Sequence, residues 1–259
     1  MLNLVAQGSG RPLLMIHGLG GHWRTWRTIA PALAAHREVL AIDLPGHGSS
    51  PPTADSNTFA GLVNSVEAFI TTLGLSGVDI VGSSLGARLV LELARRGRVG
   101  AAVALDPGGF WQGWESAFFD TTVGGSVKLL RALKPMLPTL SANPITRTLL
   151  LAQFSAHPWR LNADVVAEEL TSYADTASFA PLAHDLVTGP AQAGPAAHET
   201  GPLVIGWGRH DRVCFPAQAA RAQAAFPSAR LHWFANSGHL PHWDEPKATV
   251  DLILETVGV

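Results

Sequence analysis

Short apolar runs alternate with helix-like segments along the 259-residue chain, and this alternation restricts the fold more than any other feature. The clearest runs occupy residues 12–16, 39–42, 78–81, 101–105 and 203–207. Each has the length and continuous apolar character of a strand buried on both faces. Helices between consecutive strands predict a parallel sheet with helices on both sides. In such sheets, functional residues lie where the strands end at their carboxyl edge.

The run at 78–81 leads into Gly82-Ser83-Ser84-Leu85-Gly86, and a helix pattern follows at residues 87–94. In the order strand, sharp turn, helix, the pattern Gly-x-Ser-x-Gly predicts a strained turn that exposes a serine hydroxyl. The serine of the pattern is Ser84, because it is the central residue between Gly82 and Gly86, whereas Ser83 directly follows Gly82. A glycine-rich turn can also be purely structural, so the rest of the chain must supply the partners of a nucleophile.

A serine hydroxyl reacts only when a base lies beside it and a third group orients that base. An acid and a histidine each follow a late strand, Asp211 after residues 203–207 and His239 after residues 230–234. Two alternatives stay open. Asp106 also follows a strand and is a second candidate acid, and His242 lies one turn beyond His239.

Five motifs in this order resemble the α/β-hydrolase superfamily, in the branch with a helical cap. They are His17-Gly18-Leu19-Gly20, Asp43-Leu44-Pro45-Gly46-His47-Gly48-Ser49-Ser50, Gly82-Ser83-Ser84-Leu85-Gly86, Gly208-Arg209-His210-Asp211 and Ser237-Gly238-His239. The resemblance extends over nearly the whole chain and is weak between residues 110 and 198. It implies that Ser84 is the nucleophile, His239 the general base and Asp211 its orienting acid. It also implies an oxyanion hole formed by the backbone N–H groups of Leu19 and Leu85.

The strand rhythm stops between residues 110 and 199, where helix patterns alternate with prolines. We therefore expect an α/β-hydrolase core at residues 1–109 and 200–259, with a helical cap inserted at 110–199. Helices are expected at 126–133, 145–154 and 162–173, the last capped by Asn162. Members of the superfamily often have an additional first strand, and here we expect seven core strands. Candidate substrate-binding residues are Trp111, Trp114, Phe118, Phe154, Trp159 and Leu240, although any single aromatic residue more commonly packs a cap onto its core.

The composition limits the partners and cofactors. Charged residues make up 15% of the chain and the net charge is −2, so a nucleic-acid partner is not expected. One cysteine, Cys214, excludes a disulfide framework, and no histidine spacing suggests a metal site. We predict no cofactor, a small-molecule substrate and a monomer or homodimer. The absence of a long apolar segment predicts a protein without a membrane span, located in the cytoplasm.

The identity of the nucleophile excludes some reactions of the superfamily. Branches of the superfamily that open epoxides or remove halides use an aspartate at the position of Ser84. The resemblance therefore implies a serine hydrolase that cleaves carboxylic esters of small to medium apolar substrates through an acyl-enzyme. Two alternatives remain: a hydrolase of carbon–carbon bonds in ring-cleavage products, and a ligand receptor with very slow turnover. The first alternative is weakened because Leu240, and not tryptophan, follows His239.

Overall fold

A single seven-stranded sheet forms the centre of the molecule in a computed structural model, which describes all 259 residues. The strands lie in the order β1-β3-β2-β4-β5-β6-β7. Only β1 is antiparallel to its neighbour, and all other pairs are parallel. The strands are β1 (Leu4–Gln7), β2 (Pro12–Ile16), β3 (Glu38–Ile42), β4 (Asp79–Ser83), β5 (Ala102–Leu105), β6 (Leu203–Gly208) and β7 (Arg230–Phe234). The fold class and the seven strands expected from the sequence are confirmed.

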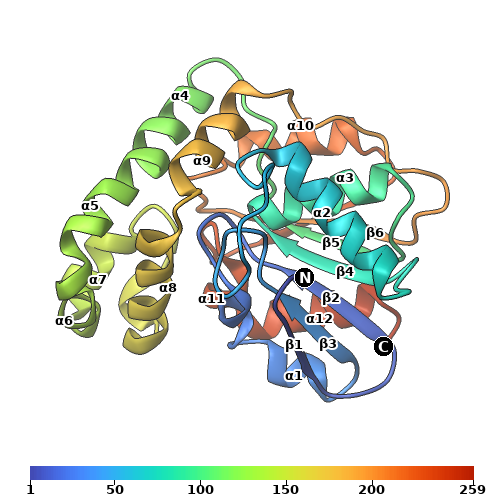
Figure 1. Cartoon of the computed structure of the whole chain (residues 1–259), viewed down its shortest axis with the longest axis horizontal. Helices are drawn as coiled ribbons and strands as arrows, with labels where there is room; N and C mark the ends of the chain where they lie inside the picture. The colour runs from blue at the N-terminus through green and yellow to red at the C-terminus, as the bar shows by residue number, and fades with distance from the viewer.

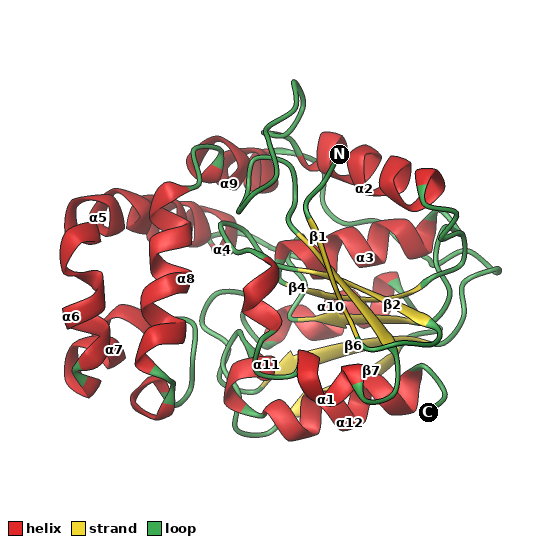
Figure 2. Cartoon of the chain, turned by 60° about the horizontal axis from the view of Figure 1, so that its bottom comes forward, coloured by secondary structure: helices red, strands yellow, loops and turns green.

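Helices cover both faces of this sheet, as Figure 2 shows. One face carries α2 (Phe59–Thr72), α3 (Leu85–Arg95) and α10 (Ala217–Ala225), and the other carries α1 (Ala30–Ala34) and α12 (Pro246–Thr256). A short helix, α11 (Pro241–Asp244), precedes α12. No helix is both long and apolar enough to cross a membrane.

The core consists of two apolar layers, one on each side of the sheet. Leu14 and Ile16 of β2 belong to the layer under α2 and α3, whereas Leu13 and Met15 belong to the layer under α1 and α12. Successive side chains of a strand point to opposite faces. Because both faces are buried, neither can be polar, and this explains the continuous apolar runs in the sequence.

Between β5 and β6 the chain forms six helices, which gather beyond one end of the strands, apart from the helices that cover the two faces (Figure 1). They are α4 (Glu115–Phe119), α5 (Gly125–Leu133), α6 (Leu137–Ala142), α7 (Pro144–Leu151), α8 (Ala163–Asp175) and α9 (Phe179–Thr188). We call residues 115–188 the helical segment. The three helices expected here are confirmed as α5, α7 and α8, and the Asn162 side chain does cap α8, accepting hydrogen bonds from Asp164 and Val165.

Prolines explain two wrong expectations. The apolar spacing of residues 25–35 predicts one continuous helix, but the chain forms a 3₁₀ turn at Trp23–Trp26 and restarts as α1, with Pro31 in its first turn. Pro138 predicts a break between helices, but it lies inside helix α6. That proline lies in the first turn of α6, where a missing N–H costs nothing.

Candidate active site

The turn between β4 and α3 holds Ser84 in a strained conformation. Its φ is 56° and its ψ is −114°, a region that side-chain-bearing residues rarely occupy. A Cβ on Gly82 would lie 2.3 Å from the carbonyl carbon and oxygen of Gly86, and one on Gly86 would lie 2.2 Å from the Ile16 carbonyl oxygen. Only glycines at these two positions allow the turn to close this tightly.

Ser84 and His239 line one small cavity of about 30 Å³ at the carboxyl edge of the sheet. Its remaining walls come from the loop after β2, from the helical segment and from the loops after β6 and β7. The lining residues are Gly18, Leu19, Thr25, Ser83, Ser84, Phe119, Val123, Phe154, Glu169, Tyr173, Phe179, Val213, His239 and Leu240. The structure thus brings the serine and the histidine, far apart in sequence, to the same enclosed space.

The imidazole of His239 is oriented by Asp211. Its Nδ1–H donates to Asp211 Oδ2 at 2.8 Å, so Nε2 is the nitrogen that remains to accept a proton. The other oxygen of Asp211 accepts from the backbone N–H groups of Val213 (2.7 Å) and Cys214 (3.0 Å). Both side chains are almost fully buried. The backbone N–H of His239 donates to the carbonyl of Phe154 at 2.8 Å, which joins this loop to the helical segment.

Asp106, the alternative acid, lies close to Asp211 without binding the imidazole. It has a positive φ of 49°, and its Oδ1 accepts from the backbone N–H of Gly208 at 2.8 Å. Burial, reinforced by the negative charge of Asp211, raises the pKa of Asp106 well above its usual value. A neutral carboxyl cannot stabilise an imidazolium by charge, so this arrangement favours Asp211 as the acid.

Two other histidines near the site, His242 and His17, make contacts that stabilise the fold. His242 is fully buried, stacks on Trp26 with ring centroids 4.7 Å apart, and lies outside the cavity. Burial lowers the pKa of His242 to about 3. His17 donates from Nδ1 to the Gly18 carbonyl (2.7 Å) and accepts at Nε2 from the N–H of Leu44 (3.0 Å). It therefore braces the loop after β2.

The two backbone N–H groups predicted to form an oxyanion hole make no hydrogen bond to the main chain. Leu85 is the first residue of α3, so its N–H has no acceptor within the helix. The N–H of Leu19 makes no hydrogen bond to the backbone, and Leu19 lines the cavity. Both groups thus remain available for an anion that forms beside Ser84.

Of the six candidate substrate-binding residues, the structure places Phe154 and Leu240 in the cavity wall. The other four lie elsewhere. Trp114 and Trp159 are 64% and 48% exposed, Phe118 meets Trp114 edge to face, and Trp111 packs on Phe119 outside the cavity. Three further polar residues of the wall, Thr25, Glu169 and Tyr173, were not predicted from the sequence. Their side chains look like ordinary helix or loop residues until the fold joins the two segments.

Three buried side chains near His239 are also potential metal ligands. Ligand atoms of Asp211, Cys214 and His239 lie within 4.8 Å of one another. Burial, followed by the charge of Asp211, raises the pKa of the Cys214 thiol well above its usual value, so it is a poor ligand. Asp211 and His239 already bind each other through Oδ2 and Nδ1. The donor set therefore does not suit a metal.

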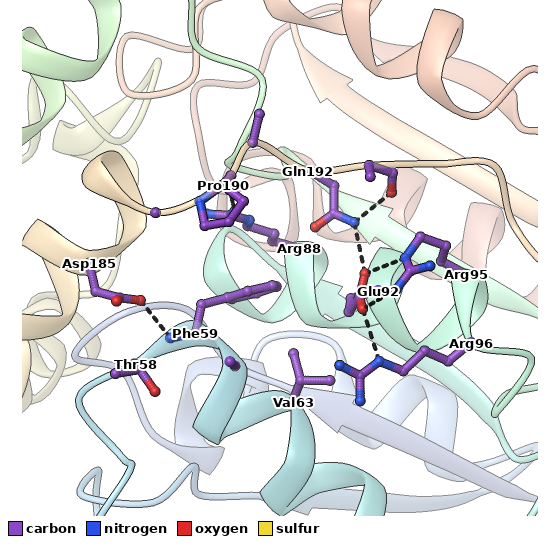
Figure 3. A pocket seen from close by; sticks show the side chains of 14 residues that line it. Thr58, Phe59, Val63, Arg88, Glu92, Arg95, Arg96, Asp185, Pro190 and Gln192 are labelled. Carbon is purple, nitrogen blue, oxygen red and sulfur yellow. Dashed lines mark hydrogen bonds and ion pairs between the residues drawn. The ribbon is translucent and has the colours of Figure 1, made fainter.

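A second cavity, of about 300 Å³, lies between α2, α3 and the segment after α9 (Figure 3). The guanidinium of Arg88 stands 4.2 Å above the ring of Phe59 and donates to the carbonyls of Leu186 (3.2 Å) and Pro190 (2.5 Å). Asp185 accepts from the N–H of Phe59 at 2.7 Å. This cavity shares no residue with that of Ser84. Its polar contacts join the end of the helical segment to the helix behind Ser84.

A mostly parallel sheet, with a strained serine between a central strand and the following helix, defines the α/β-hydrolase fold. The family model described as "Alpha/beta hydrolase family" matches residues 13–252, and the chain belongs to this family.

Its similar proteins differ in the reaction named for them. The 2-hydroxy-6-oxo-6-phenylhexa-2,4-dienoate hydrolase of Burkholderia cepacia is 28% identical over 98% of this chain and 90% of its own length. The dihydrolipoyllysine-residue acetyltransferase component of the acetoin cleaving system of Cupriavidus necator is 30% identical over 92% of this chain, which spans only 61% of that protein. A thermophilic esterase from Thermogutta terrifontis shares the fold, with a TM-score of 0.74, 18% identity and coverage of 99% of this chain and 92% of the esterase. The family match supports hydrolysis as the class of reaction, whereas the names of these proteins leave the bond that is cleaved undefined.

Proposed function

We propose that this protein is a serine hydrolase that cleaves carboxylic esters of small apolar substrates through an acyl-enzyme. One observation carries the proposal. Ser84, on a strained turn, shares an enclosed cavity with an imidazole whose other nitrogen is already bound to a buried carboxylate. A hydroxyl becomes a useful nucleophile at neutral pH in this arrangement.

The residues divide the reaction as follows. His239 Nε2 accepts the proton of Ser84 as its oxygen attacks the ester carbonyl. The N–H groups of Leu19 and Leu85 donate to the resulting oxyanion, a contribution of about 3 kcal/mol for each donor. The imidazolium, stabilised by Asp211, then gives its proton to the departing alcohol. Water, activated by the same imidazole, releases the acid.

The residues of the cavity wall suit small, uncharged substrate groups. It contains no lysine or arginine, and most of its large side chains are aromatic or aliphatic. As the helical segment lies in this structure, a volume of about 30 Å³ accommodates roughly one water-sized group, so ester hydrolysis requires this wall to move outward when an acyl chain binds. In our proposal, residues 110–199 act as a cap that contributes Phe119, Phe154 and Phe179 to this wall and closes it from solvent.

Cleavage of a carbon–carbon bond is the second candidate, because the similar Burkholderia enzyme is named for such a substrate. Ester cleavage is preferred here because the cavity offers no cationic side chain to bind the carboxylate of an anionic dienoate.

The test compares wild-type protein with two neighbouring serine substitutions. Hydrolysis of p-nitrophenyl butanoate should show a burst of nitrophenol and disappear in Ser84→Ala. Ser83→Ala is the matched control, since it removes the adjacent hydroxyl from the same cavity, and it should retain most of the activity. Fluorophosphonate labelling followed by peptide mapping should modify Ser84. Unchanged hydrolysis in Ser84→Ala would refute the assignment, and activity confined to a dienoate substrate would favour the second candidate.

A further inference from the structure

The cavity beside Ser84 contains a buried carboxyl group for which the proposed reaction has no use. Glu169 projects from α8 of the helical segment and is 4% exposed. Its Oε1 accepts a hydrogen bond from Thr25 Oγ1 at 2.5 Å, across 144 residues of sequence. Both residues line the cavity together with Ser84 and His239.

Neither oxygen of this carboxyl group has a cationic partner at bonding distance. The nearest basic atom is His22 Nε2, which lies 3.5 Å from Oε2 and makes no hydrogen bond. Burial is also the main cause that lowers the pKa of His22, so the imidazole is neutral. Arg27 is engaged by Glu168, on the outer side of α8. Buried carboxylates without a paired cation are rare in proteins, because desolvation favours the protonated form.

The groups around Glu169 come from three places and do not change this conclusion. They are Glu168 and Tyr173 on its own helix, His22, Arg24, Thr25 and Arg27 on the loop after β2, and His239 across the cavity. Burial raises the pKa of Glu169 to about 8, and the hydrogen bond from Thr25 and the charge of Arg27 offset only part of that rise. Burial and the lack of a hydrogen-bonded cation thus favour the carboxylic acid form at neutral pH, and one of its oxygens accepts from Thr25.

We propose that Glu169 sets acyl-group specificity: its protonated carboxyl donates a hydrogen bond to an ether, hydroxyl or carbonyl oxygen carried by the acyl chain of the substrate. The inference rests on the proposed ester hydrolysis. The acyl portion is the part that stays bonded to Ser84 after the alcohol leaves, so it is the lasting occupant of the cavity. An acyl chain with an oxygen atom near the carbonyl offers the acid an acceptor, whereas an alkyl chain leaves its O–H only the neighbouring hydroxyl of Tyr173, and a poorly paired buried donor is costly.

The experiment uses two p-nitrophenyl esters of equal chain length, the methoxyacetate and the butanoate, which differ by one ether oxygen in place of a methylene group. The ratio of their kcat/KM values, divided by the ratio of their hydroxide-catalysed rates, isolates recognition of the oxygen. In wild-type protein at pH 6.5 this corrected ratio should favour the methoxyacetate by about tenfold. It should fall above pH 8, because an ionised carboxylate can only accept and repels the ether oxygen.

Three substitutions complete the design. Glu169→Leu should abolish the preference, whereas Glu169→Gln should retain it and remove its pH dependence, because the amide still donates and does not titrate. Glu168→Gln is the matched control one residue away, outside the cavity, and should leave the ratio unchanged. Circular dichroism and thermal unfolding establish that each variant is folded.

The outcomes separate this inference from the proposed function. If Ser84→Ala keeps hydrolysing both esters, the proposed function fails. If hydrolysis depends on Ser84 but Glu169→Leu leaves the corrected ratio unchanged, only the inference fails. A preference lost in Tyr173→Phe and kept in Glu169→Leu would assign the donor to the tyrosine. A corrected preference for the 3-aminopropanoate ester over the butanoate at pH 6.5, lost in Glu169→Leu, would show that Glu169 is already a carboxylate that binds cations, which also overturns the inference.

Discussion

Replacing Glu169 with glutamine should make the protein progressively more stable than the wild type as the pH rises from 5 to 8. In the folded protein, burial raises the pKa of Glu169 from 4.5 to about 8. The unfolded chain releases this proton near pH 4.5, so between these values the unfolded state binds fewer protons than the folded one. Stability due to this group is therefore complete below pH 4.5 and is lost as the pH rises to about 8.

The size of the effect follows from the same shift. A shift of roughly 3.5 pKa units, at about 1.4 kcal/mol for each, gives a loss of up to ~5 kcal/mol across this range. Glutamine has nearly the same shape, can still accept from Thr25 and carries no titrating proton. The difference between variant and wild type in free energy of unfolding, measured by urea denaturation at pH 5, 6, 7 and 8, should therefore increase steadily.

Glu92 provides a control of opposite sign. Although partial burial alone would raise its pKa, hydrogen bonds from Arg95 and Arg96 outweigh it and lower the pKa of Glu92 to about 2. Its contribution to stability is present above pH 4.5, so Glu92→Gln should cost stability near neutral pH and much less at pH 3. A flat difference for Glu169→Gln between pH 5 and 8 would show that the carboxyl is already ionised in the fold. That result would remove the basis for its role as a hydrogen-bond donor.

Three further substitutions test the site and its support. Asp211→Asn should lower kcat by on the order of 10⁴-fold with little change in unfolding temperature, because His239 loses its charge partner and its correct tautomer; a loss below tenfold would point to Asp106 as the working acid. Gly86→Ala should destabilise the fold by about 1–3 kcal/mol or more, since the new Cβ meets a backbone oxygen at 2.2 Å, and equal stability in urea titration would contradict the tight turn. Arg88→Met should leave the buried carbonyl of Leu186 without its donor, at about 1–3 kcal/mol, and release the partly buried carbonyl of Pro190, and limited proteolysis should then cut near residues 186–192 first. Unaltered proteolysis would mean that Arg88 does not hold the helical segment in place.

The sequence by itself determined the sheet and the candidate catalytic residues at its carboxyl edge, because these depend on local patterns. Continuous apolar runs predict strands buried on both faces, and parallel strands bring their carboxyl ends to one edge. Residues that follow those ends, such as Ser84, Asp211 and His239, could therefore be grouped before any coordinates were available. The glycines around Ser84 carried their own signal, since a serine between two glycines after a strand indicates a strained turn.

Only the tertiary structure decided how the helical segment meets that edge. Glu169 and Tyr173 lie on one face of an amphipathic helix, and a glutamate in such a helix reads as a solvent-facing residue. Their contact with Thr25 spans 144 residues and depends on the packing of α8 against the loop after β2. The exposed tryptophans at 114 and 159 failed as pocket residues for the same reason. Hydrophobic periodicity tells which face of a helix is buried, but it carries no information about which distant segment buries it.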